Sequence, residues 1–308
     1  MESSFLTTVF LPLALFIVML GMGLGLVPQD FRGVWLYPKA VLIGLLSQLV
    51  MLPIVGFIVA SLFPLTPELA VGVMILAACP GGATSNMVTY LARGHVALSI
   101  TLTAISSLIT VFTIPVVINL AMRVFLSEGT ALQLPFGATV LQLAIITIIP
   151  VTLGMALRRY APHWAAKTES WVKWASILFL GLIIVGLLVQ QRDTVMDWIA
   201  QVGLVTLVLN LAAMVLGYGM AKLGQLDHAS TKAITVEVGI QNGTLAIAIA
   251  SAPTLLNQPV LAIPAAIYSL VMYLTGAAFV RWATQSRQLN GAKSVQESLA
   301  LSTEDKQG

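Results

Sequence analysis

Apolar positions in this chain form long runs, without the strict alternation of a half-buried strand or the single apolar stripe of a surface helix. A helix needs about 20 predominantly apolar residues to cross the hydrocarbon core of a bilayer. Nine stretches are long enough, and the spans that they predict are 5–26, 39–63, 68–91, 95–121, 137–158, 170–190, 197–222, 228–252 and 258–282. The pattern therefore predicts an all-α polytopic membrane protein with nine transmembrane helices.

The composition agrees with this prediction. Hydrophobic residues make up 58% of the chain and charged residues 9%, whereas a soluble domain carries about 25% charged residues. The single cysteine excludes a disulfide framework, and the three histidines fall near the ends of predicted spans, which argues against a His-ligated metal site. The connections are short, so we expect one transmembrane domain at 1–287, followed by a disordered polar tail at 288–308.

Basic residues lie almost entirely on one side of the predicted bundle. With nine spans, only Arg123 and Arg192 of the 15 Lys and Arg residues fall on the side of the N-terminus. Cytoplasmic loops of membrane proteins carry the excess of Lys and Arg. We therefore expect the N-terminus outside and the C-terminal tail in the cytoplasm. The net charge of +3 requires no nucleic-acid partner, because the basic residues flank apolar spans.

Two of the predicted spans contain residues that interrupt a helix. The third span holds the run 79–86, in which Pro80 removes a backbone donor and Gly81 and Gly82 lower the helical preference. The eighth span holds the run 235–244, in which glycines again let the backbone leave the helix. Five crossings separate these spans, so they run in opposite directions, which is typical of inverted-repeat transporters. The binding site is expected where the two discontinuous helices cross.

Glu237 is a carboxylate inside the eighth predicted span. An acidic residue at the centre of a membrane helix costs roughly 2.5–3.5 kcal/mol on insertion scales, so it needs a partner or a function. Gln241 and Asn242 follow it and bring amide oxygens, and the loosened backbone can turn its carbonyls inward. Hard cations take oxygen ligands of these kinds. The composition of this segment therefore indicates an ion site.

Further oxygen ligands are available on other predicted helices. The first break offers Ser85 and Asn86, and the fourth span offers Ser99 and Thr103, which share one helix face at i and i+4. Gln48 lies in the middle of the second span. Intramembrane hydroxyls and amides also simply join helices, at about 0.6 kcal/mol each. By spacing alone, Ser99, Thr103 and Gln48 fit either role.

The residues around the two breaks resemble the bile acid:sodium symporter family. The segments that carry the resemblance are 79–86, 90–99 and 237–242, within a similarity that extends over about 10–285. The resemblance implies a core domain that holds both broken helices, at about 39–121 and 197–282, and a panel domain at about 5–26 and 137–190. It also implies two sodium ions. The ligands implied for the first ion are Ser85, Asn86, Ser99, Thr103 and Glu237, and those for the second are Gln48, Glu237, Gln241 and the backbone at Val238 and Ile240.

The substrate half of the family pattern is altered in this chain. Bile-acid-type members carry a His-Asn pair in the last helix, where this chain has Met272 and Tyr273, and a similar pair in the seventh helix, where it has Leu209 and Asn210. Ala83 occupies a position where a hydroxyl is usual. A small carboxylate, pantoate-like or a keto acid, is therefore as plausible a substrate as a bile acid. The residues expected to contact it are Ala83, Thr84, Asn86, Asn210, Asn242, Ser269 and Tyr273.

The resemblance implies a sodium-coupled importer of organic anions in a cell membrane of the bacterial inner-membrane type, with no obligate protein partner. The alternative within transport is a proton-coupled or exchange-type anion or oxyanion permease of the same superfamily. A channel stays open on sequence grounds, although paired broken helices favour alternating access. An intramembrane enzyme is disfavoured, because the chain lacks a second membrane acid, a HExxH zinc motif and a GxSxG elbow.

Overall fold

The computed structural model describes residues 11–126, 134–165, isolated positions between 167 and 185, and 195–304. In this part of the chain the structure is helical, and strand pairing is limited to one isolated antiparallel bridge, between Gly81 and Gln241. The elements before the first break and through it are α1 (Leu11–Leu24), η2 (Pro28–Arg32), α2 (Gly33–Leu36), α3 (Pro38–Leu46), η3 (Ser47–Met51), α4 (Leu52–Leu62), α5 (Pro67–Ala78) and α6 (Ala83–Leu91). Those that follow are α7 (Val96–Phe125), α8 (Phe136–Tyr160), α10 (Val195–Leu223), α11 (His228–Gly239), α12 (Gly243–Ser251), η4 (Pro259–Ala262) and α13 (Ile263–Glu304).

Helices long and apolar enough to cross a bilayer confirm the membrane class. Among the described residues there are 5 such helices, or up to 6 when the bent pair Pro12–Leu24 and Pro28–Leu36 counts as one span. The predicted spans 68–91 and 228–252 do not count as single helices, because each is interrupted. The predicted span 170–190 lies largely outside the described residues. The count of nine and the inverted repeat stay predictions.

The second predicted span is a continuous apolar helix, Pro38–Leu62, with a π-helical turn at its centre. Pro53 follows this turn and has no backbone N–H, so it cannot donate to the carbonyl four residues earlier. Single π-helical turns inside α-helices occur frequently at functional sites. Gln48 lies in this turn with a side chain that is 2% exposed. The widened turn therefore lies where the sequence placed an isolated polar residue.

Both predicted interruptions are present, and the two breaks touch. The first separates α5 from α6, and the second separates α11 from α12. Asn242 N donates to Pro80 O at 2.9 Å, next to the bridge between Gly81 and Gln241. The four half-helices thus end or begin at one crossing. Backbone groups freed by an interruption inside a membrane must be satisfied by the protein itself, and here each break supplies partners for the other.

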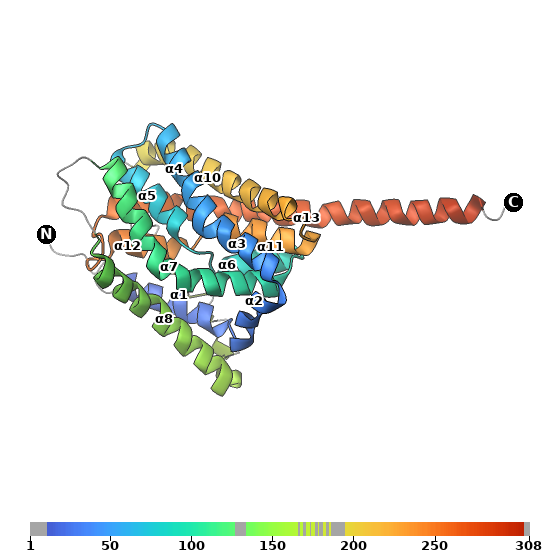
Figure 1. Cartoon of the computed structure of the whole chain (residues 1–308), viewed down its shortest axis with the longest axis horizontal. Helices are drawn as coiled ribbons and strands as arrows, with labels where there is room; N and C mark the ends of the chain where they lie inside the picture. Colours follow the sequence, from blue (N-terminus) through green and yellow to red (C-terminus); the bar gives the residue numbers. More distant parts are fainter. Residues whose placement is uncertain are drawn as a thin grey trace.

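Helices α1 and α8 pack side by side at one edge of the bundle (Figure 1). Two glycines allow the close approach. A Cβ added at Gly23 would lie 2.2 Å from Val151 O, and one at Gly154 would lie 2.5 Å from Leu20 O. Helix α13 runs through the bundle, packed on α10, and its distal part, where the sequence predicts a disordered tail, projects beyond the bundle as helix to Glu304 (Figure 1).

Candidate ion and anion site

The Glu237 carboxylate, on α11, lies in a cluster of hydroxyl groups from two other helices. Ser85 Oγ, on α6, donates to Glu237 Oε2 at 2.7 Å, and Thr103 Oγ1, on α7, donates to Oε1 at 2.7 Å. Ser99 Oγ, one turn before Thr103, lies 3.2 Å from Oε2. Asn86 Oδ1 accepts from Ser99 Oγ at 2.8 Å and from Thr103 Oγ1 at 3.3 Å. The structure therefore brings together all five side chains expected around the first ion.

These hydroxyls face more oxygen acceptors than they have protons. Ser85 Oγ lies 2.7 Å from Gly82 O as well as 2.7 Å from Glu237 Oε2, and Ser99 Oγ reaches both Asn86 and Glu237. A hydroxyl can donate only one hydrogen bond at a time. Its oxygen keeps lone pairs for another partner. A small hard cation fits such a set, because it takes carboxylate, amide and hydroxyl oxygens and balances the single negative charge of the cluster.

Gly81 allows the backbone of the first break to reach the carboxylate. A Cβ added at this position would lie 2.2 Å from Glu237 Oε1. Any larger residue would therefore displace the acid from its hydroxyl partners. The glycine that the sequence identified as a helix breaker has a second purpose here, which is to make room for Glu237.

A second polar cluster joins the π-helical turn to both breaks. Gln48 Nε2 donates to Cys79 O at 2.9 Å and to Gln241 Oε1 at 2.8 Å, and Gln241 Nε2 donates to Val238 O at 2.7 Å. Gln48 Oε1 is buried and has no hydrogen-bond partner among the described residues. Buried polar atoms are satisfied in the great majority of cases, and this oxygen can accept a cation. This cluster holds three of the groups expected around the second ion.

The backbone carbonyl of Gly239, at the end of α11, is bound by side chains from two other helices. Asn210 Nδ2, on α10, and Tyr268 OH, on α13, each donate to Gly239 O at 2.8 Å. Both side chains are fully buried. Sequence reasoning expected Asn210 to contact the substrate. In the structure it instead binds the backbone of the second break. Sequence reasoning missed Tyr268, because a lone tyrosine in an apolar span carries no positional signal.

A cavity of about 160 Å³ adjoins the crossing on the side of α1. The first residues of α6 and α12 form its polar wall, and α1 and α13 supply apolar side chains. The lining residues are Val18, Gly21, Met22, Gly82, Ala83, Thr84, Met87, Gln241, Asn242, Gly243, Thr244, Met272 and Tyr273. Asn242 caps α12 by accepting from Leu245 N at 3.0 Å, while its buried Nδ2 has no partner among the described residues. The cavity therefore offers an unused amide donor at a helix start.

Two helices begin at this cavity, α6 at Ala83 and α12 at Gly243. The first backbone N–H groups of a helix have no intrahelical acceptor, and the helix dipole makes this end positive. Helix N-termini are for this reason common sites of anion binding. The C-terminal ends of α5 and α11 lie at the same crossing and favour cations. One crossing thus presents an anion-favouring and a cation-favouring side.

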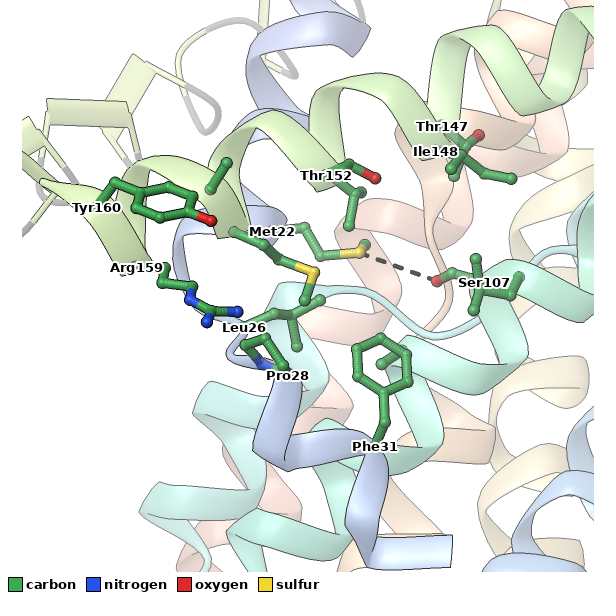
Figure 2. Close-up of a pocket in the computed structure, with 15 residues that line it drawn as sticks. Met22, Leu26, Pro28, Phe31, Ser107, Thr147, Ile148, Thr152, Arg159 and Tyr160 are labelled. Atoms are coloured by element: carbon green, nitrogen blue, oxygen red, sulfur yellow. Dashed lines mark hydrogen bonds between the residues drawn. The ribbon is translucent and has the colours of Figure 1, made fainter. Parts of the chain in front are cut away.

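A larger cavity of about 370 Å³ lies between α1, η2, α7 and α8. Figure 2 shows Arg159 and Tyr160 at one end of it and Ser107 and Thr147 at the other. Met22 lines this cavity as well as the smaller one, and Ser107 Oγ lies 3.9 Å from its sulfur. The remaining lining is mostly apolar, and Arg159 is its charged member.

Comparison with known proteins decides the family. The model of the sodium bile acid symporter family matches residues 12–198, which is more than half of the chain. The chain belongs to this family. Its members are transporters and not enzymes, so the expectation of a membrane transporter is confirmed.

Individual relatives agree. An uncharacterized sodium-dependent transporter of Bacillus subtilis, YocS, is 31% identical over 292 residues, which cover 95% of this chain and 88% of that protein. The probable chloroplastic sodium/metabolite cotransporter BASS1 of Arabidopsis thaliana is 29% identical over 85% of this chain and 63% of its own length. The ileal sodium/bile acid cotransporter of Oryctolagus cuniculus is 26% identical over 76% of this chain and 67% of its own length. Sodium dependence is common to these names, and the transported compound differs.

The expected substrate contacts divide into two groups in the structure of this family member. Ala83, Thr84, Asn242 and Tyr273 line the smaller cavity. Asn86 instead faces the hydroxyl cluster, and Asn210 and Ser269 lie outside the cavity lining. Ser269 Oγ donates to Ala265 O at 2.7 Å, within its own helix. Sequence reasoning missed the contribution of α1, because no polar residue marks Val18 or Met22.

Proposed function

We propose that this protein is a sodium-coupled importer of small organic anions that works by alternating access. Two sodium ions would bind at the crossing, the first among Ser85, Asn86, Ser99, Thr103 and Glu237, and the second among Gln48, Glu237, Gln241 and the carbonyls of Val238 and Ile240. The anion would bind in the adjoining cavity. Sodium is a cotransported substrate in this proposal, and its concentration gradient would drive import.

One observation carries the proposal: the first turn of α6 belongs to both sites. Ala83 and Thr84 line the cavity, while Ser85 and Asn86 belong to the hydroxyl cluster around Glu237. Any shift of this turn changes both sites together. Sodium bound at Ser85 and Asn86 would hold the turn in place and so preorganise the N–H groups at the start of α6 for the anion. Coupling of the two substrates follows from this shared turn.

The size and polarity of the smaller cavity favour a small carboxylate. A volume of about 160 Å³ suits a pantoate-like acid or a keto acid, and it is too small for the four-ring skeleton of a bile acid. Two helix starts and the Asn242 amide would bind the carboxylate, and Met22, Met87 and Met272 would contact the apolar part. Flexible methionines adapt to different apolar shapes. The larger cavity would then be the cytoplasmic passage, with Arg159 attracting the anion.

The proposed arrangement of domains follows the helix packing. Helices α1 and α8, with the predicted helix at 170–190, would form the panel, and the elements around the two breaks would form the core. Rocking of the core against the panel would open the anion cavity to one side at a time. We place nine helices in a cell membrane, with the N-terminus outside and the C-terminus in the cytoplasm, because this arrangement puts nearly all basic residues on the cytoplasmic side.

Sodium binding can be tested before the anion is known. The melting temperature of the purified protein is measured during a titration with sodium chloride, with potassium chloride keeping the ionic strength constant, for wild type and Glu237→Gln. An ion that binds only the folded state stabilises by about 2.7 kcal/mol at a hundredfold excess over Kd. We expect a sodium-specific rise in wild type that is absent in Glu237→Gln. Pantoate, 2-keto acids and taurocholate are then added at saturating sodium.

The outcomes separate the alternatives. A further rise with a small carboxylate, and none with taurocholate, would support the proposed substrate class. Equal melting temperatures in sodium and potassium would contradict sodium coupling and favour a proton-coupled or exchange-type permease. The control for the mutation is Glu68→Gln, because Glu68 lies in the first turn of α5, away from the crossing, and is expected to leave the sodium response unchanged.

A further inference from the structure

The carbonyl of Gly239 is bound by two side chains from two different helices. Asn210 on α10 and Tyr268 on α13 donate to it at 2.8 Å each. Both residues are 0% exposed, and Tyr268 is among the largest fully buried side chains of the protein. A buried hydrogen bond contributes only about 1 kcal/mol net, but an unmade one is costly. Two donors on one oxygen are more than satisfaction of a single buried carbonyl requires.

This oxygen is available because the helix ends here. In an uninterrupted helix Gly239 O would accept from the N–H four residues later, that of Gly243. Gly243 N instead donates to Gln241 O at 3.0 Å. The Asn210 amide has one useful orientation, because a flipped amide would place Oδ1 against the carbonyl oxygen. Its Nδ2 therefore faces the backbone at the break, and the direction of the Gly239 peptide group is fixed by α10 and α13 together.

Fixing this carbonyl also constrains the direction of the next one, that of Ile240. Ile240 has extended backbone, with φ −110° and ψ 103°, and consecutive carbonyls of extended backbone point to opposite sides. The Ile240 carbonyl therefore points away from the side where Asn210 and Tyr268 hold Gly239. On the other side of Gly239, the Val238 carbonyl already faces the polar cluster, where it accepts from Gln241 Nε2 at 2.7 Å. The two carbonyls that flank Gly239 are those proposed as sodium ligands.

We infer that Asn210 and Tyr268 are positioning residues for the second sodium site, which hold the Gly239 carbonyl away from the ion and so direct the Ile240 carbonyl toward it, beside the Val238 carbonyl. The inference rests on the proposed sodium coupling. It assigns to Asn210 a function in sodium affinity, where sequence reasoning expected a substrate contact. It also ties the affinity of the ion to α10 and α13, two helices that contribute none of the proposed sodium ligands.

The test uses Tyr268→Phe, which keeps the ring and removes the hydroxyl, and Asn210→Leu, which keeps the approximate shape and removes the donor. Matched controls are Thr275→Val on α13 and Thr206→Val on α10, since both hydroxyls bond only to carbonyls of their own helix in the described contacts. For each protein the melting temperature is measured in potassium alone and during a sodium titration. The apparent Kd for sodium is fitted to the rise in melting temperature and is called the sodium midpoint below. We expect it to increase about five- to tenfold in Tyr268→Phe and Asn210→Leu and to stay unchanged in both controls.

The melting temperature in potassium and the sodium midpoint test different things. A merely structural function would lower the melting temperature in potassium and leave the sodium midpoint where it is in wild type, and this result would overturn the inference while sodium coupling stands. Absence of any sodium-specific rise in wild type would contradict the proposed function, and the inference with it. If Asn210→Leu does not yield folded protein, the sodium midpoint of Tyr268→Phe decides.

Discussion

The hydroxyl of Ser85 donates a hydrogen bond of 2.7 Å to the carboxylate of Glu237, although 152 residues separate them along the chain. This bond joins the start of α6 to α11 and so links the two broken spans beside their backbone contacts. Its energy depends on the charge of Glu237, because hydrogen bonds to charged groups are about twice as strong as neutral ones. The contact therefore links the two broken spans, and its strength changes when the charge of Glu237 changes.

Replacing Ser85 by alanine should weaken sodium binding. The variant removes one of five proposed ligands of the first ion and one partner of the Glu237 carboxylate. We therefore expect the sodium midpoint, the apparent Kd fitted to the rise in melting temperature, to increase at least about tenfold, equivalent to about 1.4 kcal/mol. The measurement is the titration described above. Ser61→Ala is the control, because Ser61 is exposed and bonds to Phe57 O of its own helix. An unchanged midpoint in Ser85→Ala would remove this residue from the site.

Gly81→Ala should disrupt the same site by steric contact. The added methyl group would lie 2.2 Å from Glu237 Oε1, so the carboxylate or the break must move. We expect a loss of stability of about 1–3 kcal/mol, as for other overpacked buried positions, and no sodium-specific rise in melting temperature. Gly203→Ala is the control, since a Cβ there meets no atom within 4 Å. A wild-type sodium response of Gly81→Ala would contradict the prediction, because it would show that sodium still binds when the methyl group moves the Glu237 carboxylate away from the first break.

Asp227 should make stability depend on pH at the start of α11. Its Oδ1 accepts from Ala229 N at 2.8 Å and from Ser230 N at 3.0 Å. Partial burial raises the pKa of Asp227, but the hydrogen bonds from Ser230 and Ala229 and the nearby His95 together hold this pKa below its ordinary value. Because the folded-state pKa is the lower one, the contribution is present above the unfolded pKa of about 3.9 and is lost as pH falls through the folded value.

The prediction for Asp227 is checked by measuring the melting temperature between about pH 6 and about pH 3, a range that brackets the unfolded pKa of the carboxyl group. Asp227→Asn keeps a capping side chain but does not titrate, so its curve should fall less steeply than that of wild type at the acidic end. Asp227→Ala should lose about 1 kcal/mol of stability at neutral pH, the usual effect of removing an N-cap. Identical acid limbs for wild type and Asp227→Asn would contradict the prediction.

Lys232 should stabilise the core near its predicted cytoplasmic end. Its Nζ donates to Ala92 O, at the end of α6, at 3.0 Å and to Ala283 O, on α13, at 3.2 Å. Lys232→Met keeps the apolar stem and removes these donors, so we expect a loss of about 1.5–3 kcal/mol, seen as a lower melting temperature with an unchanged sodium midpoint. Lys222→Met is the control, because Lys222 is exposed and its Nζ lies 5.7 Å from the Tyr218 ring centroid. Equal losses of stability in Lys232→Met and Lys222→Met would show that the hydrogen bonds of Lys232 to Ala92 and Ala283 do not stabilise the core.

The class of this protein followed from short-range features that its residues carry locally. Run length and the scarcity of charge predicted membrane helices, because crossing a bilayer is a property of single segments. Pro80 and the glycines near Glu237 predicted the two interruptions for the same reason, since the backbone preferences of proline and glycine act locally. Glu237 predicted an ion site, because a carboxylate inside an apolar span is costly whatever the span packs against.

Contacts across the bundle depended on the tertiary structure. Asn210 shows this most clearly: the sequence marks it as a polar residue in a membrane helix, but only the packing of α10 on α11 aims its amide at Gly239 instead of at the cavity. Tyr268, Val18 and Met22 gave no local signal, because an apolar or aromatic residue in an apolar span is ordinary. Their positions around the crossing arise from distances between helices, and these distances depend on close approaches such as those at Gly23 and Gly154, which no single segment specifies.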